Sequence, residues 1–167
     1  QSCLSISDKI EPSQLIDMFR SNKGKEISTL GKSDYDCLSV IMKECLERKL
    51  GYLYAVHIPA KEICAAAFFT KCNRKSVFLF SASLPVARAN GAMTFLIDSY
   101  IRENAGNEIT LDFEGSNDLN LSRFYKSFGA RETLYIHYKK NELPVFVSLG
   151  AAIVKRMRKI NSIKHIK

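Results

Sequence analysis

The chain has 167 residues, of which 46% are hydrophobic, and this size and composition predict one globular domain with a sizeable core. Its formal net charge of +8 at pH 7 is unevenly distributed, because residues 151–167 contain six Lys or Arg residues and no acidic residue, which leaves +2 for the remainder. The rest of the chain, residues 1–150, is therefore nearly neutral. This part lacks the strongly basic charge that is typical of a nucleic-acid-binding domain.

The five cysteines indicate reduced thiols. They are odd in number, show no CxxC spacing and lie mostly in apolar segments, at positions 3, 37, 45, 64 and 72. This pattern favours a cytoplasmic location and offers no paired metal ligands, so we expect no metal site. The chain begins at Gln1 without a charged-then-apolar leader, which indicates a processed form or a piece of a longer protein.

Two amphipathic helices are predicted first. Pro12 suits the first turn of a helix that ends near residues 22–24, and Ser33 begins a longer helix. Apolar residues recur at intervals of three and four along both: Leu15, Ile16 and Phe19 in the first, and Tyr35, Leu38, Met42, Cys45 and Leu46 in the second.

The pattern changes to that of strands from Gly51 onward. Three segments rich in aromatic and β-branched residues are separated by short polar turns: YLYAVHI (52–58), EICAAAFFT (62–70) and KSVFLFSAS (75–83). They predict three antiparallel strands joined as hairpins.

A loop of small residues, LPVARANG (84–91), then leads into another helix that ends by Gly106. Its apolar stripe consists of Ala89, Ala92, Met93, Leu96, Ile97 and Tyr100. The remaining elements are a strand in EITLDFE (108–114), a helix in LNLSRFYKSF (119–128) closed by Gly129, and a strand in ETLYIHY (132–138).

This order of elements predicts an α/β (α+β) fold with a mixed, mainly antiparallel sheet and helices on both faces. A further strand is compatible with SCLSIS (2–7). The step from strand 75–83 through a helix to strand 108–114 is a crossover, which makes these two strands parallel. Open α/β sheets bind ligands at the carboxyl ends of their strands, so the loop at 84–91 is the expected site.

The end of the chain is predicted to be a basic amphipathic helix (143–167) that follows a single domain spanning 1–142. Its uncharged run, 143–154, is too short to cross a bilayer of about 30 Å at about 1.5 Å per residue. Such a helix docks on its own domain, on a second copy or another partner, or on a membrane surface. Its basic residues are either solvated or bind RNA phosphates or anionic lipid.

The loop at 84–91 has the features of an anion-binding turn. The helix that follows it presents unpaired amides and a partial positive charge, which attract phosphate without a basic side chain. Gly91 permits close approach of the backbone, and the Arg88 guanidinium adds a charge suited to phosphate oxygens. Alternatively, Gly91 and Ala92 only allow the helix to pack closely on the sheet.

The order of elements, together with this turn, resembles the GNAT acyltransferase fold over nearly all of residues 1–140. In GNAT proteins the turn after the fourth strand carries Gln or Arg, two residues, Gly, one residue, and Gly or Ala, and it holds the pyrophosphate of acetyl-CoA. The corresponding residues are Arg88, Ala89, Asn90, Gly91, Ala92 and Met93, of which Met93 departs from the pattern. The resemblance implies an acyl-CoA donor whose phosphates bind at Arg88–Ala92 and whose thioester lies along Phe80, Ser81, Ala82 and Ser83.

Two later segments resemble the Fem-like branch of the same superfamily. DFEGS (112–116) is followed by RFYKSFGA (123–130), which places Tyr125 and Gly129 at the spacing of a GNAT helix. Fem-like proteins include ligases that transfer amino acids from aminoacyl-tRNA to peptidoglycan precursors. Full Fem ligases resemble two such modules joined together, so the resemblance is consistent with one half of a longer protein.

Acyl transfer to an amine needs a base, donors to the oxyanion, and an acid for the leaving group. In strand 108–114 alternation puts Thr110, Asp112 and Glu114 on one face, and two neighbouring carboxylates, if partly buried, raise the pKa of one toward that of a base. Glu114 lies nearest the loop and is the expected base, directly or through water. Alternatively, these carboxylates have no catalytic role, and they only solvate an exposed face of the sheet or cap the next helix.

Tyr125 is the expected general acid. It lies on an apolar stripe with Leu121, Phe124 and Phe128, which packing alone explains, but the resemblance to GNAT proteins implies that it protonates the leaving thiolate. No His or Cys forms a recognisable nucleophile–base pair, so direct transfer to the amine is expected.

Three functions remain open on the sequence. The primary prediction is an N-acyltransferase that uses acetyl-CoA or another acyl-CoA and an amine of a small molecule or peptide. The second is a Fem-like aminoacyltransferase that binds tRNA through the basic tail. The third is a non-catalytic GNAT-like module that binds a partner or forms a homodimer.

Overall fold

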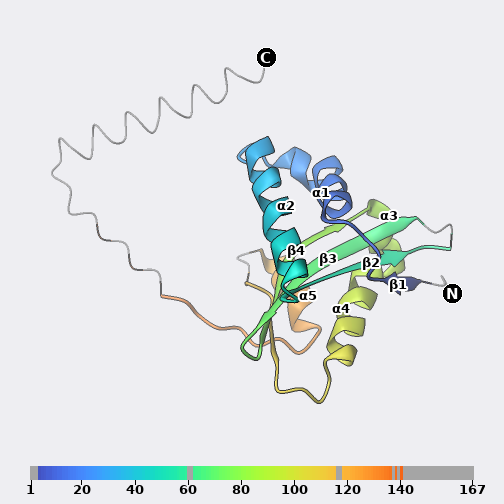
Figure 1. Ribbon diagram of the computed structural model, residues 1–167. Helices are drawn as coiled ribbons and strands as arrows, with labels where there is room; N and C mark the ends of the chain where they lie inside the picture. The colour runs from blue at the N-terminus through green and yellow to red at the C-terminus, as the bar shows by residue number, and fades with distance from the viewer. Residues whose placement is uncertain (1–3, 60–61, 116–117, 137, 139, 141–167) are drawn as a thin grey trace. The chain divides into compact units, whose positions relative to one another are not determined.

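The computed structural model describes residues 4–59, 62–115, 118–136, 138 and 140 (Figure 1). The chain consists of two compact units, Gln1–Arg131 and Glu132–Lys167. The described helices and strands all belong to the first unit.

Five strands form one sheet in the order β1-β2-β3-β4-β5. They are β1 (Ser5–Ser7), β2 (Gly51–His57), β3 (Ile63–Cys72), β4 (Lys75–Ser83) and β5 (Thr110–Asp112). The strands β1 to β4 pair antiparallel, whereas β5 is parallel to β4. This arrangement confirms the predicted mixed, mainly antiparallel sheet, including the strand at the start of the chain and the parallel pair across the crossover.

Helices cover both faces of this sheet, as expected (Figure 1). The helices are α1 (Pro12–Ser21), the 3-10 helix η1 (Lys23–Glu26), α2 (Lys32–Glu47), α3 (Pro85–Asn90), α4 (Ala92–Glu103) and α5 (Leu119–Lys126). On one face α1 contacts β4 and α2 contacts β2, while on the other face α4 contacts β3 and β2. Aromatic residues of α5 pack against the same core cluster as α4.

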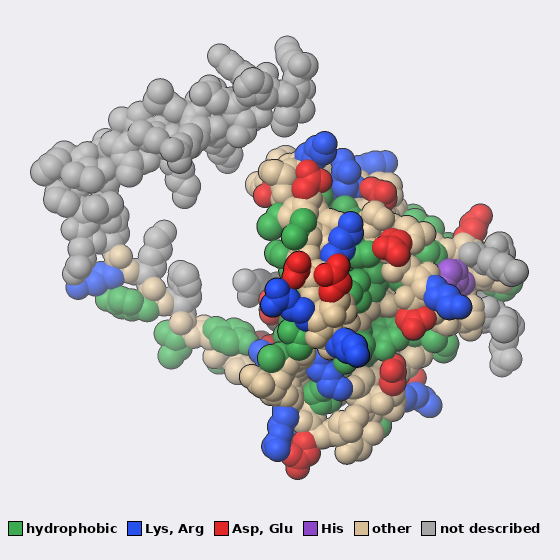
Figure 2. Space-filling view, in the orientation of Figure 1, with side chains coloured by type: hydrophobic (Ala, Val, Ile, Leu, Met, Phe, Trp, Pro, Cys, Tyr) green, Lys and Arg blue, Asp and Glu red, His purple; other side chains and the backbone are tan. Residues whose placement is uncertain are grey.

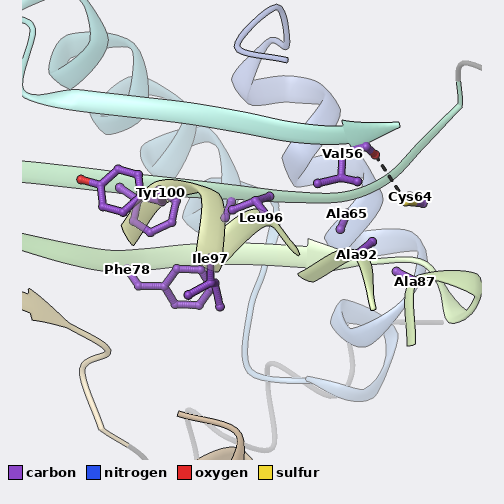
Figure 3. Packing of buried hydrophobic residues seen from close by; sticks show 11 residues of the cluster. Val56, Cys64, Ala65, Phe78, Ala87, Ala92, Leu96, Ile97 and Tyr100 are labelled. Atoms are coloured by element: carbon purple, nitrogen blue, oxygen red, sulfur yellow. Dashed lines mark hydrogen bonds between the residues drawn. The ribbon is translucent and has the colours of Figure 1, made fainter. Parts of the chain in front are cut away.

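The central strand β3 is covered on both faces, which explains its continuous apolar run. Residues 64–69 are all fully buried. Because side chains alternate along a strand, Phe69 belongs to the cluster beneath α4, and its neighbour Phe68 belongs to the cluster beneath α1 and α2. Figure 3 shows the first of these clusters, with Leu96 and Ile97 of α4 against the strands.

Charged side chains of both signs are interspersed on the face seen in Figure 2. Among the described residues, several charged side chains form exposed pairs one turn apart, such as Arg48 with Glu44 at the end of α2 and Arg102 with Asp98 on α4. This distribution agrees with the nearly neutral body expected from the sequence. Within the described ranges, no helix is long and apolar enough to cross a membrane.

The strand predicted at 132–138 is not formed by the described residues of that segment. Residues 132–136 have no strand conformation, and Leu134, Tyr135 and Ile136 are 87%, 76% and 97% exposed. Strand-forming residues make a strand only where a neighbouring edge supplies pairing and packing, and none of the described strands pairs with residues 132–136. The predicted helix at 143–167 lies outside the described residues.

Candidate functional site

β4 and β5 separate after a short parallel contact. β5 pairs only with Lys75–Val77, so residues 78–83 of β4 have no sheet neighbour on this edge within the described ranges. Backbone N–H and C=O groups on such an edge are available to an extended ligand. Phe80–Ser83, which were predicted to lie beside the thioester, form the end of this open edge.

The segment predicted as a loop contains a helix. Pro85 suits the first position of α3, and no other helix breaker follows before Gly91. Gly91 then adopts the left-handed conformation (φ +70°, ψ +21°), which ends α3 and precedes α4. Ala87, rather than the predicted Ala89, packs in the core, because Ala87 is buried and Ala89 is exposed.

The start of α4 carries open backbone amides. The Asn90 side-chain oxygen accepts the N–H of Ala92 at 3.0 Å, and the fourth N–H of the helix is bonded to the Gly91 carbonyl. The N–H groups of Met93 and Thr94 therefore remain without an intrahelical acceptor. An anion that binds the Ala92 N–H, one of the predicted site amides, has to displace the Asn90 side chain from it. The backbone N–H of Met93 can bind an anion even though the Met93 side chain departs from the GNAT motif.

A pocket of about 440 Å³, called the η1 pocket below, lies where η1 faces the end of β4 and α3. It is lined by Phe19, Asn22, Lys23, Glu26, Ser81, Ala82, Ser83, Pro85 and Arg88. Four of the predicted site residues are thus brought together, namely 81–83 and Arg88. Phe80 and residues 89–92 lie outside this lining, and the Phe80 ring packs on Phe19 with 4.7 Å between ring centroids. Sequence reasoning missed Lys23 and Glu26, because no local motif marks them and they meet β4 only through the fold.

The η1 pocket contains three charged side chains. Lys23 forms an ion pair with Glu26 three residues later. Its hydrogen bond and charge hold the pKa of the Glu26 carboxyl below the usual value, and the Arg88 guanidinium adds a smaller contribution in the same direction. Glu26 is therefore an anionic group suited to bind a cation.

The predicted base Glu114 does not lie in a strand. β5 ends at Asp112, and Glu114 is exposed with a left-handed backbone (φ +59°). Its N–H donates to Asp112 Oδ1 at 2.8 Å, which is the turn geometry that takes it out of strand alternation. The expectation that it shares a strand face with Asp112 is therefore wrong, and its role as a base stays a prediction.

Asp112 also differs from the expected environment. Its carboxylate binds Lys75 Nζ at 2.7 Å across the β4–β5 pair. This hydrogen bond, followed by the one from the Glu114 N–H, lowers the pKa of Asp112 below the usual value instead of raising it. Asp112 is thus a structural anion that holds β5 to β4.

The lowered pKa of Asp112 predicts an acid-dependent loss of stability. A carboxyl whose folded pKa lies below its unfolded pKa stabilises the fold above the unfolded value, and that contribution disappears as the pH falls through the folded value. Urea unfolding from pH 7 to pH 3 should therefore show a shallower decline for Asp112→Asn than for the parent chain. Asp17→Asn, which alters an exposed carboxylate 3.9 Å from Arg20, should retain the parent slope. Equal slopes for the two variants would contradict this role of Asp112.

Tyr125 lies in α5 within an aromatic cluster beside β4 and β5. Its ring stacks on Phe113 with 4.4 Å between centroids and meets Phe78 edge-on at 6.3 Å. Burial raises the pKa of its hydroxyl above the usual value, so the phenol keeps its proton to a higher pH than an exposed tyrosine does. Because Phe113 precedes Glu114, the stack brings the segment of Glu114 beside α5.

The described part of the chain contains no group of side chains arranged for cysteine chemistry or for metal binding. Cys64 is fully buried, donates its thiol to the Val56 carbonyl at 3.4 Å, and has its pKa raised by burial. Its packing agrees with the apolar segment in which it lies in the sequence. No group of three or more His, Cys, Asp or Glu side chains that could hold a metal ion occurs among the described residues.

Comparison with known proteins identifies the fold through solved structures alone. No family model matches the sequence, and no curated protein matches it. A predicted acetyltransferase from Clostridium acetobutylicum, solved with acetyl-CoA, is similar over 87% of this chain and 97% of its own, with a TM-score of 0.60 and 16% identity.

Two further solved structures, both named AAC(6'), are similar in the same way. The aminoglycoside 6'-N-acetyltransferase AAC(6')-Ih from Acinetobacter baumannii matches 84% of this chain and 99% of its own, with a TM-score of 0.55 and 16% identity. AAC(6')-Iy, solved with the bisubstrate analog CoA-S-monomethyl-acetylneamine, matches 85% of this chain and 100% of its own, with a TM-score of 0.59 and 12% identity. The chain therefore has the fold of the GNAT acetyltransferases. None of these three structures is a Fem-type ligase.

Proposed function

We propose that the protein is an N-acyltransferase that moves an acyl group, in the simplest case acetyl, from acyl-CoA to a primary amine. The observation that carries the proposal is the unpaired edge of β4 at residues 78–83, which the chain follows with α3 and the left-handed turn at Gly91. A Cβ added at Gly91 would meet no atom within 4 Å, so the turn has room for a ligand at the backbone. The GNAT fold of the chain supports the same donor, because two of its solved neighbours were crystallised with acetyl-CoA or a CoA analog.

In this proposal the residues of the chain have the following roles. The amides at the start of α4 bind the pyrophosphate of the donor, and the open edge at 80–83 aligns the pantetheine and thioester. The η1 pocket admits the amine from the side of Ser81–Ser83. Transfer forms the amide N–C bond and breaks the thioester C–S bond, while Glu114 takes the proton of the amine, directly or through water, and Tyr125 gives one to the thiolate.

Titration of the purified chain with acetyl-CoA by calorimetry tests this proposal. Gly91→Glu should weaken binding at least about tenfold, since it places a carboxylate where the phosphates bind and strains the left-handed backbone by roughly 1–2 kcal/mol. Gly106→Glu is the matched control, because Gly106 has the same kind of backbone (φ +83°) and the same open space at the far end of α4. It should bind acetyl-CoA like the parent.

An aminoacyl-tRNA donor is the alternative, and the Fem-like segments 112–116 and 123–130 and the basic residues of 151–167 favour it. No acetyl-CoA binding at millimolar concentration, together with charged-tRNA binding that falls steeply with salt and requires 151–167, would replace the CoA proposal with this one. Binding of neither donor would favour a non-catalytic module that binds a partner.

A further inference from the structure

The η1 pocket contains charges of both signs, because Lys23, Glu26 and Arg88 all line it. From these charges we infer that the acceptor is a small zwitterionic amine, that is, a primary amine that also carries a carboxylate or a phosphate. Arg88 and Lys23 bind its anionic group, and Glu26 binds its ammonium, which releases one proton to solvent to give the free amine that attacks the thioester. This inference rests on the proposed acyl transfer and names the substrate class of the same site.

Arg88 is the strongest indicator of an anionic group on the acceptor. Among the described residues it has no carboxylate within ion-pair distance, yet it lines the pocket and its charge reaches Glu26. Successive residues of a helix point about 100° apart. Since Ala87 is buried in the core, Arg88 points away from that core, toward the pocket that it shares with η1.

Arg88 and the amides proposed to bind the donor belong to two different helices. Those amides belong to Met93 and Thr94 at the start of α4, after the chain has turned at Gly91, whereas Arg88 belongs to α3 before the turn. We therefore assign Arg88, which resembles the first position of the GNAT motif and lines the η1 pocket, to the acceptor. Its fork of donors fits a carboxylate or phosphate on the acceptor.

The other two charges set where the amine binds. Lys23 and Glu26 are about two-thirds exposed (65% and 66%), so their pairing is weak and yields to a ligand that offers both charges. The three side chains sum to one positive charge, which favours an acceptor with an anionic group over a polycationic amine. Asn22, Ser81 and Ser83 add polar groups to the same wall.

The test compares acceptors that differ only in the anionic group. Alanine is paired with alaninamide, and phosphoethanolamine with ethanolamine, while spermidine represents polycations. Release of CoA thiol is followed with acetyl-CoA as donor, and amine binding to the CoA-bound and free protein is followed by calorimetry. The anionic member of at least one pair should bind about 10- to 100-fold more tightly, the effect of a charge-assisted hydrogen bond, and the preferred pair identifies a carboxylate or a phosphate.

Variants of the residues that line the η1 pocket test whether the preference for an anionic acceptor arises there. Arg88→Gln should remove the difference within the preferred pair without changing the affinity for acetyl-CoA, and Glu26→Gln should weaken binding of both members. Arg102→Gln is the matched control, because Arg102 is an exposed helical arginine paired with Asp98 away from the pocket.

Three results would overturn the inference. They are a loss of acetyl-CoA affinity in Arg88→Gln with the preference intact, stronger binding of spermidine than of either anionic amine, and no binding of any anionic amine at millimolar concentration. Failure of the proposed acyl transfer would appear separately, as absence of acetyl-CoA binding in the parent chain.

Discussion

Replacement of Phe69 by Ala should lower the free energy of unfolding by about 3–5 kcal/mol, the usual cost of removing a fully buried phenylalanine. Phe69 has no exposed surface, stacks on Tyr100 with 3.8 Å between ring centroids, and contacts the rings of Tyr54 and Phe78. The cavity would lie inside a filled core, because β3 is packed on both faces. A loss of this size is a large part of the 5–15 kcal/mol that stabilises a typical domain.

Urea unfolding followed by circular dichroism measures this effect, and Phe95→Ala is the matched control. Phe95 is 36% exposed on α4, so the same chemical change should cost about 1 kcal/mol or less. If Phe69→Ala does not fold, Phe69→Leu leaves a smaller cavity and should give an intermediate loss. A loss for Phe69→Leu no greater than that for Phe95→Ala would show that the aromatic cluster beneath α4 does not stabilise the sheet.

The sheet and its covering helices were predictable from sequence because their patterns are local and strong. In β3 the apolar run is uninterrupted, as a strand buried on both faces requires, and in α2 the stripe that contains Tyr35 and Met42 is buried as its spacing predicts. The parallel pairing of β4 with β5 followed from the crossover rule. These features depend on the periodicity of apolar residues and on the order of the elements, and both can be determined from a single sequence.

The predictions that failed depend on what surrounds a segment. The residues of 132–138 have strand propensity, but the described part of this segment finds no edge with which to pair. Alternation predicted that Glu114 continues a strand, but Asp112 accepts its N–H and turns the chain. Small residues at 85–90 were interpreted as a loop, although proline at the first position and alanines after it are equally compatible with one short helix.

The candidate site was predictable only on the side of β4. Residues 80–83 and the turn at Gly91 follow each other along the chain, so one motif identifies them. Lys23 and Glu26 reach the same place from the amino-terminal part of the chain, through packing of α1 on β4. A charged pair three residues apart on a short helix has no distinguishing sequence pattern, and only the fold brings it to Arg88.

Replacement of Tyr125 by Phe should reduce kcat for acyl transfer about 10²- to 10⁴-fold, the usual contribution of a general acid, while the affinity for acetyl-CoA stays unchanged. Phenylalanine retains the ring that stacks on Phe113 and meets Phe78, so only the proton donor is lost. The rate of CoA thiol release at saturating amine gives kcat, and calorimetry gives the affinity. Tyr135→Phe, which alters an exposed tyrosine (76%), should leave both values at the parent level.

The dependence of kcat on pH separates this chemical role from a packing role. Burial raises the pKa of Tyr125, so the parent chain should lose the proposed activity on the alkaline side only above the ordinary tyrosine pKa of about 10. Tyr125→Phe has no proton to lose, and its low activity should not decline further there. If the variant retains the parent kcat and the parent alkaline limb, Tyr125 is a packing residue and the thiolate takes its proton from another group or from water. A lower kcat with an unchanged alkaline limb would likewise assign the effect to packing, because ionisation of the tyrosine would then play no part in the rate.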